Sequence, residues 1–414
     1  MIAALALLSS LASALPVQAA PADAEAWWEL GWTRYAAADF GGAIGAWAEV
    51  SRLEPTHPEL EMWLAVARAR EQWEHTPVPV APVPTVRPEG PTVRFAAVGD
   101  TMMGSDLMKG EAGLSPDNGA ALFDATRDDL RSVDVAFLNL EGPLADLLPS
   151  QKCAPGSTDC HAFRTPTRYV SALTGAGIDV AQLSNNHAMD LGADGMASSM
   201  RTLDAAGIAH AGRYGDIAHL ERHGLKIAVV GAHSGSCCLN DNDIDEVSRA
   251  VAWADQEADL VLFVFHGGAE GAAARHVEGK VEVAWGEPRG DVRALAHAAV
   301  DAGADLVIGT GPHVLRAMEV YRSRLVAYSL GNYTGYRQFG TQGGYGGTTV
   351  LLEAELAMNG VLVSAKLHPL ALDGESVPHV DLTGAAYAQI RELSDADFPG
   401  SGVTIAADGT LSWR

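Results

Sequence analysis

The sequence has few basic residues. It contains 28 Lys and Arg residues against 52 Asp and Glu residues, which leaves a formal net charge of −24. Nucleic-acid-binding proteins need a basic surface, because much of their affinity comes from contacts with phosphates. The composition therefore argues against a nucleic acid as partner. An anionic ligand would need a local source of positive charge.

Long apolar runs are absent except at the N-terminus, where residues 2–15 are mostly apolar. Val17, Gln18 and Ala19 follow with the small-residue pattern that signal peptidase recognises, although the segment lacks an initial Lys or Arg. We interpret residues 1–19 as a signal peptide, which predicts export to the periplasm or cell envelope and no transmembrane span after cleavage. The alternative is an N-terminal membrane anchor, for which the run is short.

Cysteines are also scarce: Cys153, Cys160, Cys237 and Cys238. An even number of cysteines in an exported chain permits disulfides. Pairing within each loop and cross-pairing of the two loops both remain open. The spacing matches neither a zinc finger nor an iron–sulfur site, so we interpret these cysteines as structural.

Residues 23–75 resemble one tetratricopeptide repeat. The matching positions are Trp27, Leu30, Gly31, Ala43, Trp47 and Pro55, and a further helix is expected at 58–73. One repeat cannot bury its apolar face alone, so we expect it to dock on the main domain, another copy or a protein partner. An ordinary helical hairpin is the alternative. The Pro-rich residues 76–91 predict an extended linker and a domain boundary.

From residue 92 onward, short apolar runs alternate with Ala/Leu-rich segments. The expected strands are 93–98, 134–140, 179–183, 226–231, 260–265, 305–308, 324–329 and 348–353, and the expected helices are 120–132, 167–176, 193–206, 247–255 and 292–302. This alternation predicts an α/β domain. The stretch 350–369 alternates as antiparallel strands do, so we expect mixed sheets. We assign residues 92–372 to this domain and 373–414 to its C-terminal extension.

Residues able to bind a metal follow nearly every expected strand. They are Asp100, Glu141, Asn186 with His187, His266 and His313. Each residue alone is weak evidence for a metal site, because Asn and Gly-Asp are common in turns. Strand ends meet at one edge of a sheet, however, so five coincidences predict one shared site. Such ligands suit one or two divalent Mn, Zn or Fe ions, which would activate water and supply positive charge.

Six motifs between residues 93 and 333 make the chain similar to the CapA family of bacterial capsule and poly-γ-glutamate synthesis proteins. They are GDTMMG, NLEGPL, LSNNHAMDLGADG, HGGAEG, DAGADLVIGTGPHVLRAMEVY and YSLGNY, in family order. The resemblance implies a metallophosphatase-like fold, which is a layered α/β/β/α sandwich with mixed sheets. Here the small α-helical repeat unit would precede that fold.

The resemblance also implies roles for individual residues. Asp100 and His313 would bind a first metal, Asn186 and His266 a second, and Glu141 would bridge the two. His187 would act as the catalytic acid, with Asp190 beside it. Asp190, Glu270, Glu319 and Asn332 would orient the other side chains.

Two positions depart from the family pattern. Thr310 and Gly311 stand where a further histidine is expected before His313, and Met102 replaces a histidine after Asp100. The departure leaves three alternatives open: a weaker second metal, a single metal, or binding without turnover. His161, His233 and His276 are alternative ligands.

We interpret the chain as an exported, metal-dependent enzyme that hydrolyses or transfers at a phosphoester or acyl bond of an anionic cell-surface polymer or its precursor. The alternative is a non-catalytic polymer-binding or export component whose helical repeat recruits a partner. An intracellular nucleotide phosphatase is disfavoured by the export signal and by the lack of a Gly-Lys-Ser/Thr phosphate loop.

Overall fold

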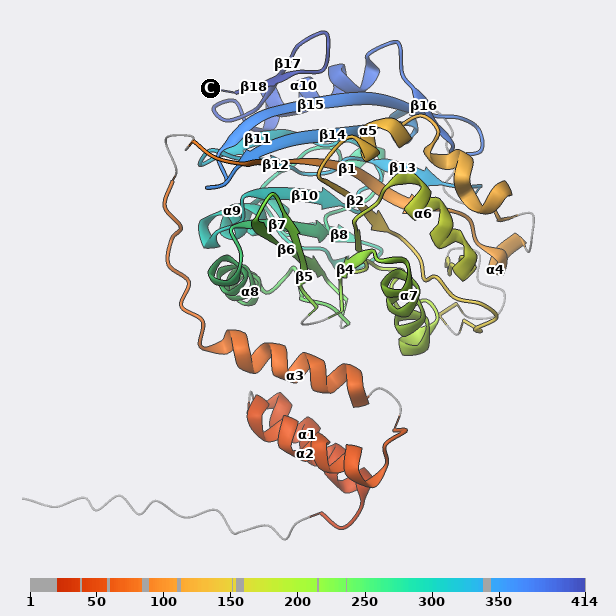
Figure 1. The fold of residues 1–414 in the computed structure, drawn as a ribbon, viewed down its shortest axis with the longest axis vertical. Helices are drawn as coiled ribbons and strands as arrows, with labels where there is room; N and C mark the ends of the chain where they lie inside the picture. The colour runs from red at the N-terminus through yellow and green to blue at the C-terminus, as the bar shows by residue number, and fades with distance from the viewer. Residues whose placement is uncertain are drawn as a thin grey trace, which may run out of the picture. The chain divides into compact units, whose positions relative to one another are not determined.

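The computed structural model describes residues 21–413, apart from residues 38, 58–59, 84–88, 110–112, 151, 154–159, 214–215, 236 and 338–343. Backbone contacts divide the chain after Ala67 into two units, which are drawn in Figure 1. The expected signal peptide at 1–19 lies outside the described residues. Within the described part, no helix is long and apolar enough to cross a membrane.

The first unit consists of helices with a small aromatic core. Its elements are α1 (Ala24–Ala36), α2 (Phe40–Leu53) and the first part of α3 (Leu60–Glu74). Trp47 is fully buried and its indole N–H donates to the Trp28 carbonyl at 3.3 Å. A Cβ at position 31 would lie 2.1 Å from the Trp47 ring, so only glycine fits there. Its assignment as a tetratricopeptide repeat stays a prediction.

The second unit contains two large sheets, of which the first has the order β16-β15-β14-β1-β2-β3-β4, with β13 also paired to β1. The strands are β1 (Thr92–Met102), β2 (Val135–Leu140), β3 (Val180–Gln182), β4 (Ala209–Ala211), β13 (Asn332–Gly335), β14 (Thr348–Ala357), β15 (Leu362–Leu372) and β16 (Pro378–Val380). Strands β1 to β4 are parallel, whereas β14 to β16 are antiparallel. The sheet is mixed, as predicted.

The second sheet has the order β11-β12-β10-β7-β6-β5. Its strands are β5 (Ala218–Arg222), β6 (Leu225–His233), β7 (Leu260–His266), β10 (Leu306–Thr310), β11 (Met318–Tyr321) and β12 (Arg324–Ala327). The four central strands are parallel, and both edge strands are antiparallel to their neighbours. Central parallel strands are buried on both faces, which explains why they are continuous apolar runs.

The two sheets pack face to face, with helices on their outer sides (Figure 1). The core between them joins Phe95 of β1 to Val229, Leu262 and Ile308 of the second sheet. The outer face of the first sheet is covered by α5 (Arg127–Arg131), α6 (Val170–Ala176) and α7 (Gly192–Ala206), and the second sheet contacts α8 (Ile244–Glu257) and α9 (Val292–Ala302). The predicted α/β/β/α layering and the preceding helical unit are confirmed.

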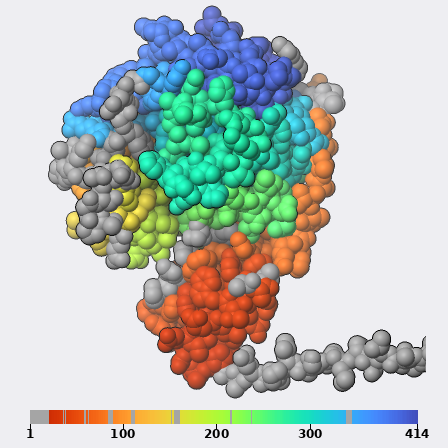
Figure 2. All heavy atoms as spheres, turned by 180° about the vertical axis from the view of Figure 1, so that it is seen from behind, coloured from red at the N-terminus to blue at the C-terminus, as the bar shows by residue number. Residues whose placement is uncertain are grey.

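The C-terminal residues pack on the main domain. Helix α10 (Ala385–Asp397) places Ile390 in the core between the sheets. On the molecular face shown in Figure 2, this blue region adjoins the green-teal segment after β7. Asp397 of α10 accepts a hydrogen bond from the Val277 N–H at 2.9 Å and contacts His276 at 2.7 Å.

Two expectations about element boundaries are wrong. The helix expected at 120–132 is replaced by the 3-10 helix η2 (Pro116–Phe123) and the short α5, because the chain leaves helical geometry at Thr126, where φ is −133°. Asp100 and His266 lie inside β1 and β7 and not after them. In β1 the extension follows from pairing with β13, which is distant in sequence.

Candidate metal centre

Strand ends from both sheets bring four of the predicted ligands together. Asp100 lies on β1, Glu141 follows β2, His266 ends β7 and His313 follows β10. The His313 Nδ1 atom is 3.1 Å from Asp100 Oδ2, and its Nε2 atom is 3.6 Å from Glu141 Oε1. His266 Nε2 lies 3.9 Å from the same Glu141 oxygen. Asp100, Glu141 and His266 have no solvent exposure.

Asp100 is fully hydrogen-bonded. Its Oδ1 atom accepts from Asn139 Nδ2 at 2.8 Å, and the Gly311 N–H donates to both carboxylate oxygens at 3.1–3.2 Å. Burial opposes ionisation, but the hydrogen bonds and charges of His266 and His313 hold the Asp100 pKa below its ordinary value. Asp100 is therefore a fixed anionic anchor for the site.

Glu141 is the opposite case. Neither of its carboxylate oxygens has a hydrogen-bond partner among the described residues, although the side chain is fully buried. Burial raises its pKa well above the ordinary value. A buried acceptor without a donor is costly and needs an explanation. A cation between Glu141 and its histidine neighbours would provide one.

Two other buried atoms without hydrogen-bond partners belong to side chains that can bind a metal. His266 Nε2 and Asn186 Oδ1 are buried and lack hydrogen-bond partners within the described part of the chain. Asp100, Glu141 and His313 each offer a ligand atom within 4.8 Å of the others. These carboxylate, imidazole and amide donors fit a first-row divalent ion.

Thr310 orients His266. Its hydroxyl donates to the Phe265 carbonyl at 3.1 Å, so it can only accept from His266 Nδ1, also at 3.1 Å. Asn139 Nδ2, which is 3.2 Å from the same nitrogen, donates to Asp100. This assignment leaves His266 Nε2 as the atom that faces Glu141. Such a second hydrogen bond commonly sets the tautomer of a ligating histidine.

The loop after β3 is connected to this centre by asparagines. Asn139 Oδ1 accepts from Asn185 Nδ2 at 3.0 Å, and Asn185 Oδ1 accepts from the His187 N–H at 3.1 Å. A chain of hydrogen bonds therefore runs from Asp100 to His187. Asn186 lies between Asn185 and His187 in this loop, and its Oδ1 has no hydrogen-bond partner within the described part of the chain.

His187 and Asp190 form a buried pair. His187 Nδ1 donates to Asp190 Oδ2 at 2.7 Å, which leaves Nε2 free to interact with a ligand. Burial lowers the pKa of His187 to about 4, against the raising effect of Asp190. In the metal-free protein His187 is therefore a neutral imidazole, and it becomes an acid only if a bound anion raises its pKa.

Lys152 also belongs to this region, and sequence reasoning missed it. Its ammonium pairs with Asp190 and donates to the Asn186 carbonyl at 3.0 Å. Lys152 is a single basic residue in an irregular stretch, so no motif marks it. Asn139 was also missed, although a polar residue inside an apolar strand is a signal that the sequence contains.

The other predicted residues have different fates. Asn332 Oδ1 lies 2.8 Å from His313 Nδ1, as an orienting residue should. Glu270 lies close enough for its charge to raise the pKa values of Glu141 and His313. Glu319 instead pairs with His297 at 2.7 Å and accepts from Tyr328 at 2.8 Å, so its expected orienting role is wrong.

Of the alternative histidine ligands, His233 contacts a residue of the centre. Its Nδ1 is 2.8 Å from the His266 carbonyl oxygen, and the two rings are 5.5 Å apart. His276 pairs with Asp397 at 2.7 Å, and among the described residues only His266 and His313 form ion pairs with Asp100 and Glu141. At position 311 a Cβ would lie 3.2 Å from the His266 ring, so a larger residue would crowd that ligand.

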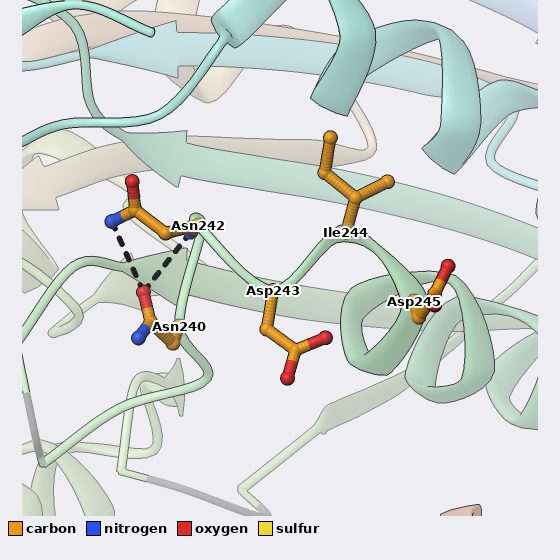
Figure 3. A pocket seen from close by; sticks show the side chains of 5 residues that line it. All are labelled: Asn240, Asn242, Asp243, Ile244 and Asp245. Atoms are coloured by element: carbon orange, nitrogen blue, oxygen red, sulfur yellow. Dashed lines mark hydrogen bonds between the residues drawn. The ribbon is translucent and has the colours of Figure 1, made fainter.

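Two other groups of polar residues are weaker candidates. Asp129, Glu353 and His368 lie close together, but the charges of Lys366 and Arg94 already act on Glu353. A surface pocket at the start of α8 is lined by Asn240, Asn242, Asp243, Ile244 and Asp245 (Figure 3). There the carboxylates of Asp243 and Asp245 point in different directions, so they do not converge on a ligand.

Comparisons with known proteins agree with the motifs. The model of the family described as bacterial capsule synthesis protein PGA_cap matches residues 94–336. The capsule biosynthesis protein CapA of Bacillus anthracis is 27% identical over 65% of this chain and 66% of its own length. The PGA biosynthesis protein CapA of Bacillus subtilis is 28% identical over 57% of this chain and 61% of its own.

The chain therefore spans less than two thirds of the length of these curated relatives. Among solved structures, a purple acid phosphatase from yellow lupin seeds is similar with a TM-score of 0.34 and 10% identity, covering 73% of this chain and 54% of that one. The family match covers more than half of the chain, including Asp100, Glu141, Asn186, His266 and His313. The protein belongs to the bacterial capsule synthesis protein PGA_cap family.

Proposed function

We propose that this protein is an exported, metal-dependent hydrolase or transferase that acts at a phosphoester or acyl bond during synthesis of capsule, poly-γ-glutamate or another anionic envelope polymer. The observation that carries the proposal is Glu141, a buried carboxylate without a donor beside two histidines. Family membership supports the link to capsule synthesis. The metal site supports the proposed chemistry.

The ligands proposed for one or two divalent ions are Asp100, Glu141, Asn186, His266 and His313. When bound, such ions activate water and stabilise negative charge on the oxygens of an ester undergoing displacement. Their positive charge would also attract an anionic polymer to a protein with a net charge of −24.

The residues around the metals have their own proposed tasks. Asp190 holds the His187 ring through Nδ1, so that Nε2 is available to the substrate. A bound phosphate or carboxylate beside His187 would favour the protonated imidazole, which could then protonate a leaving oxygen. Asn139 and Asn185 connect the loop of His187 to Asp100 through hydrogen bonds.

Export is part of the proposal. Cys153 pairs with Cys160 and Cys237 pairs with Cys238, so the pairing left open by the sequence is within each loop. Structural disulfides are typical of oxidising compartments outside the cytosol. The pairing supports a periplasmic or cell-envelope location, independently of the N-terminal segment.

A non-catalytic role is the second candidate. Gly311 in place of a histidine ligand puts a backbone N–H against Asp100, and this favours a protein that binds polymer without turnover. In that case the helical unit would recruit a protein partner during assembly or export.

Metal content and hydrolysis distinguish the two candidates. Protein purified without chelator should contain about one to two equivalents of Mn, Zn or Fe by elemental analysis, and Glu141→Gln should contain less. His187→Ala should keep the metal and lose hydrolysis of an aryl phosphate or of poly-γ-glutamate. Metal-loaded wild-type protein that is inert toward both substrates would favour the binding role, and absence of any metal uptake would contradict the site itself.

A further inference from the structure

The two ends of one disulfide loop contact the His187–Asp190 pair. On one side, the Lys152 ammonium pairs with Asp190 and donates to the Asn186 carbonyl. On the other side, the Phe163 N–H donates to Asp190 Oδ2 at 2.7 Å. The Phe163 ring also stacks on His187, with ring centroids 4.1 Å apart.

The Cys153–Cys160 disulfide lies between these two contacts. Lys152 immediately precedes Cys153, and Phe163 follows Cys160 by three residues. The disulfide holds the two cysteine Cα atoms 5.6 Å apart. Both flanks are therefore tied to one another near the Asp190 carboxylate.

Asp190 depends on these flanks for its hydrogen bonds. Its carboxylate accepts from three sources: the His187 ring, the Lys152 ammonium and the Phe163 backbone. Two of the three come from the ends of the disulfide loop. Losing them would leave a fully buried carboxylate with a single partner, which is unfavourable. The orientation of His187 then has less support.

We propose that the Cys153–Cys160 disulfide is a clamp that holds Lys152 and Phe163 against His187 and Asp190, and that Lys152 is a positioning residue of the site. The expected effect of this disulfide on turnover rests on the proposed function, because His187 and Asp190 are the proposed catalytic pair. Its effect on the position of His187 is independent of turnover.

A dithiol reductant would open the clamp. Two electrons from the dithiol break the S–S bond, the two sulfurs take up protons to become thiols, and the dithiol closes to its own disulfide. Cys153 and Cys160 are half-buried, whereas Cys237 and Cys238 are 6% and 2% exposed. Limited reduction should therefore open the Cys153–Cys160 bond first.

The test measures how quickly diethyl pyrocarbonate modifies His187, followed by mass spectrometry of the peptide. His187 is 6% exposed and should react slowly in the oxidised protein. The double variant Cys153→Ser/Cys160→Ser should react several-fold faster at His187, and dithiol treatment should bring the wild type to the same rate. His379, with a side chain 61% exposed, is the internal reference and should not change.

The matched disulfide control is Cys237→Ser/Cys238→Ser, which should keep slow modification of His187 and remain sensitive to dithiol. Lys152→Met should also increase His187 modification and lower kcat more than it changes KM, and Lys152→Arg should restore part of both. Lys280→Met, at a side chain 67% exposed, is the control for loss of one positive charge.

Equal modification rates of His187 in the wild type and in Cys153→Ser/Cys160→Ser would overturn the clamp. So would a Lys152→Met protein that matches the wild type in both His187 modification and kcat. If the wild type proves inactive, the proposed catalytic function fails, but the modification rates still decide whether the disulfide holds His187.

Discussion

The Gly311 N–H donates to both carboxylate oxygens of Asp100, at 3.1 and 3.2 Å. Gly311 therefore binds Asp100 through its backbone N–H, at a position where the family pattern led us to expect a histidine ligand. Its φ of 106° and the close approach of His266 make glycine the residue that fits. The site is thus built for a backbone donor at this point.

Gly311→Ala should lower both stability and metal affinity. A Cβ would lie 3.1 Å from the Gly267 nitrogen and 3.2 Å from the His266 ring, in a backbone conformation that L-residues disfavour. We expect a loss of about 1–3 kcal/mol in the free energy of unfolding, measured by urea denaturation.

The matched control is Gly175→Ala in α6, where no atom lies within 4 Å of the added Cβ. Removing a helical glycine should stabilise by roughly 0.5–1 kcal/mol. If Gly311→Ala is as stable as the wild type, the backbone at this position is not the constraint that we infer.

Glu141→Gln should separate metal binding from folding. The wild-type carboxylate is buried without a donor, so the metal-free variant should be as stable as the metal-free wild type or more so. Added Mn²⁺ or Zn²⁺ should stabilise the wild type, by about 2.7 kcal/mol at a hundredfold excess over Kd, and should not stabilise the variant. Thermal unfolding with and without metal measures both effects.

Glu353→Gln provides the comparison for this experiment, because Glu353 belongs to the other carboxylate–histidine group. It should keep the metal-dependent stabilisation. A Glu141→Gln protein that gains as much stability from metal as the wild type would remove Glu141 from the ligand set.

Asp241→Asn should flatten the pH dependence of stability. Burial raises the pKa of Asp241 to about 7, against the lowering effect of Arg289. Because the folded-state pKa exceeds the unfolded value of about 3.9, the stability contributed by protonated Asp241 is fully present below pH about 4 and is lost as the pH rises through about 7. The variant lacks this titration.

Urea denaturation between pH 4 and pH 8 should therefore show a difference between wild type and Asp241→Asn that grows in favour of the variant as the pH rises. The exposed Asp245 offers a control, and Asp245→Asn should follow the wild-type curve. A constant difference between Asp241→Asn and the wild type across this range would contradict a buried titrating carboxyl at position 241.

Trp47→Ala should unfold the helical unit without affecting the metal centre. Trp47 is fully buried and packs on Gly31, so its loss should cost about 3–5 kcal/mol. Hydrogen exchange should accelerate in α1 and α2 and remain unchanged in β1 and β7. Leu53→Ala on α2, at a position 42% exposed, should have a much smaller effect. Accelerated exchange in β1 would mean that the two units fold as one.

Much of the fold follows from local patterns. Apolar runs such as 260–265 and 226–231 predict buried strands, because whether a segment can form a buried strand depends mainly on residues that are neighbours in sequence. The helix expected at 120–132 failed because the chain leaves helical geometry at Thr126, where φ is −133°. The Thr126 hydroxyl lies 2.7 Å from the Tyr333 hydroxyl, 207 residues further along the chain, and the apolar pattern does not contain that contact.

The candidate site divides in the same way. The acidic and histidine residues at strand ends, from Asp100 to His313, were visible because ligand types recur at the ends of apolar runs. Lys152 could not be identified in this way. Its role depends on the approach of an irregular stretch to Asp190, which lies 38 residues further along the chain. The mistaken role for Glu319 arose because a motif shows that residues are neighbours in sequence and says nothing about where a side chain points.

The sequence by itself determined most of the central strands of the two sheets, the family and the set of candidate ligands, since these depend on residue type and on spacing along the chain. Only the tertiary structure decided which of those ligands meet, how the cysteines pair and why Gly311 stands beside Asp100. The physical reason is distance along the chain: Asp100 and Gly311 are 211 residues apart, and only the packing of two sheets brings them into hydrogen-bonding contact.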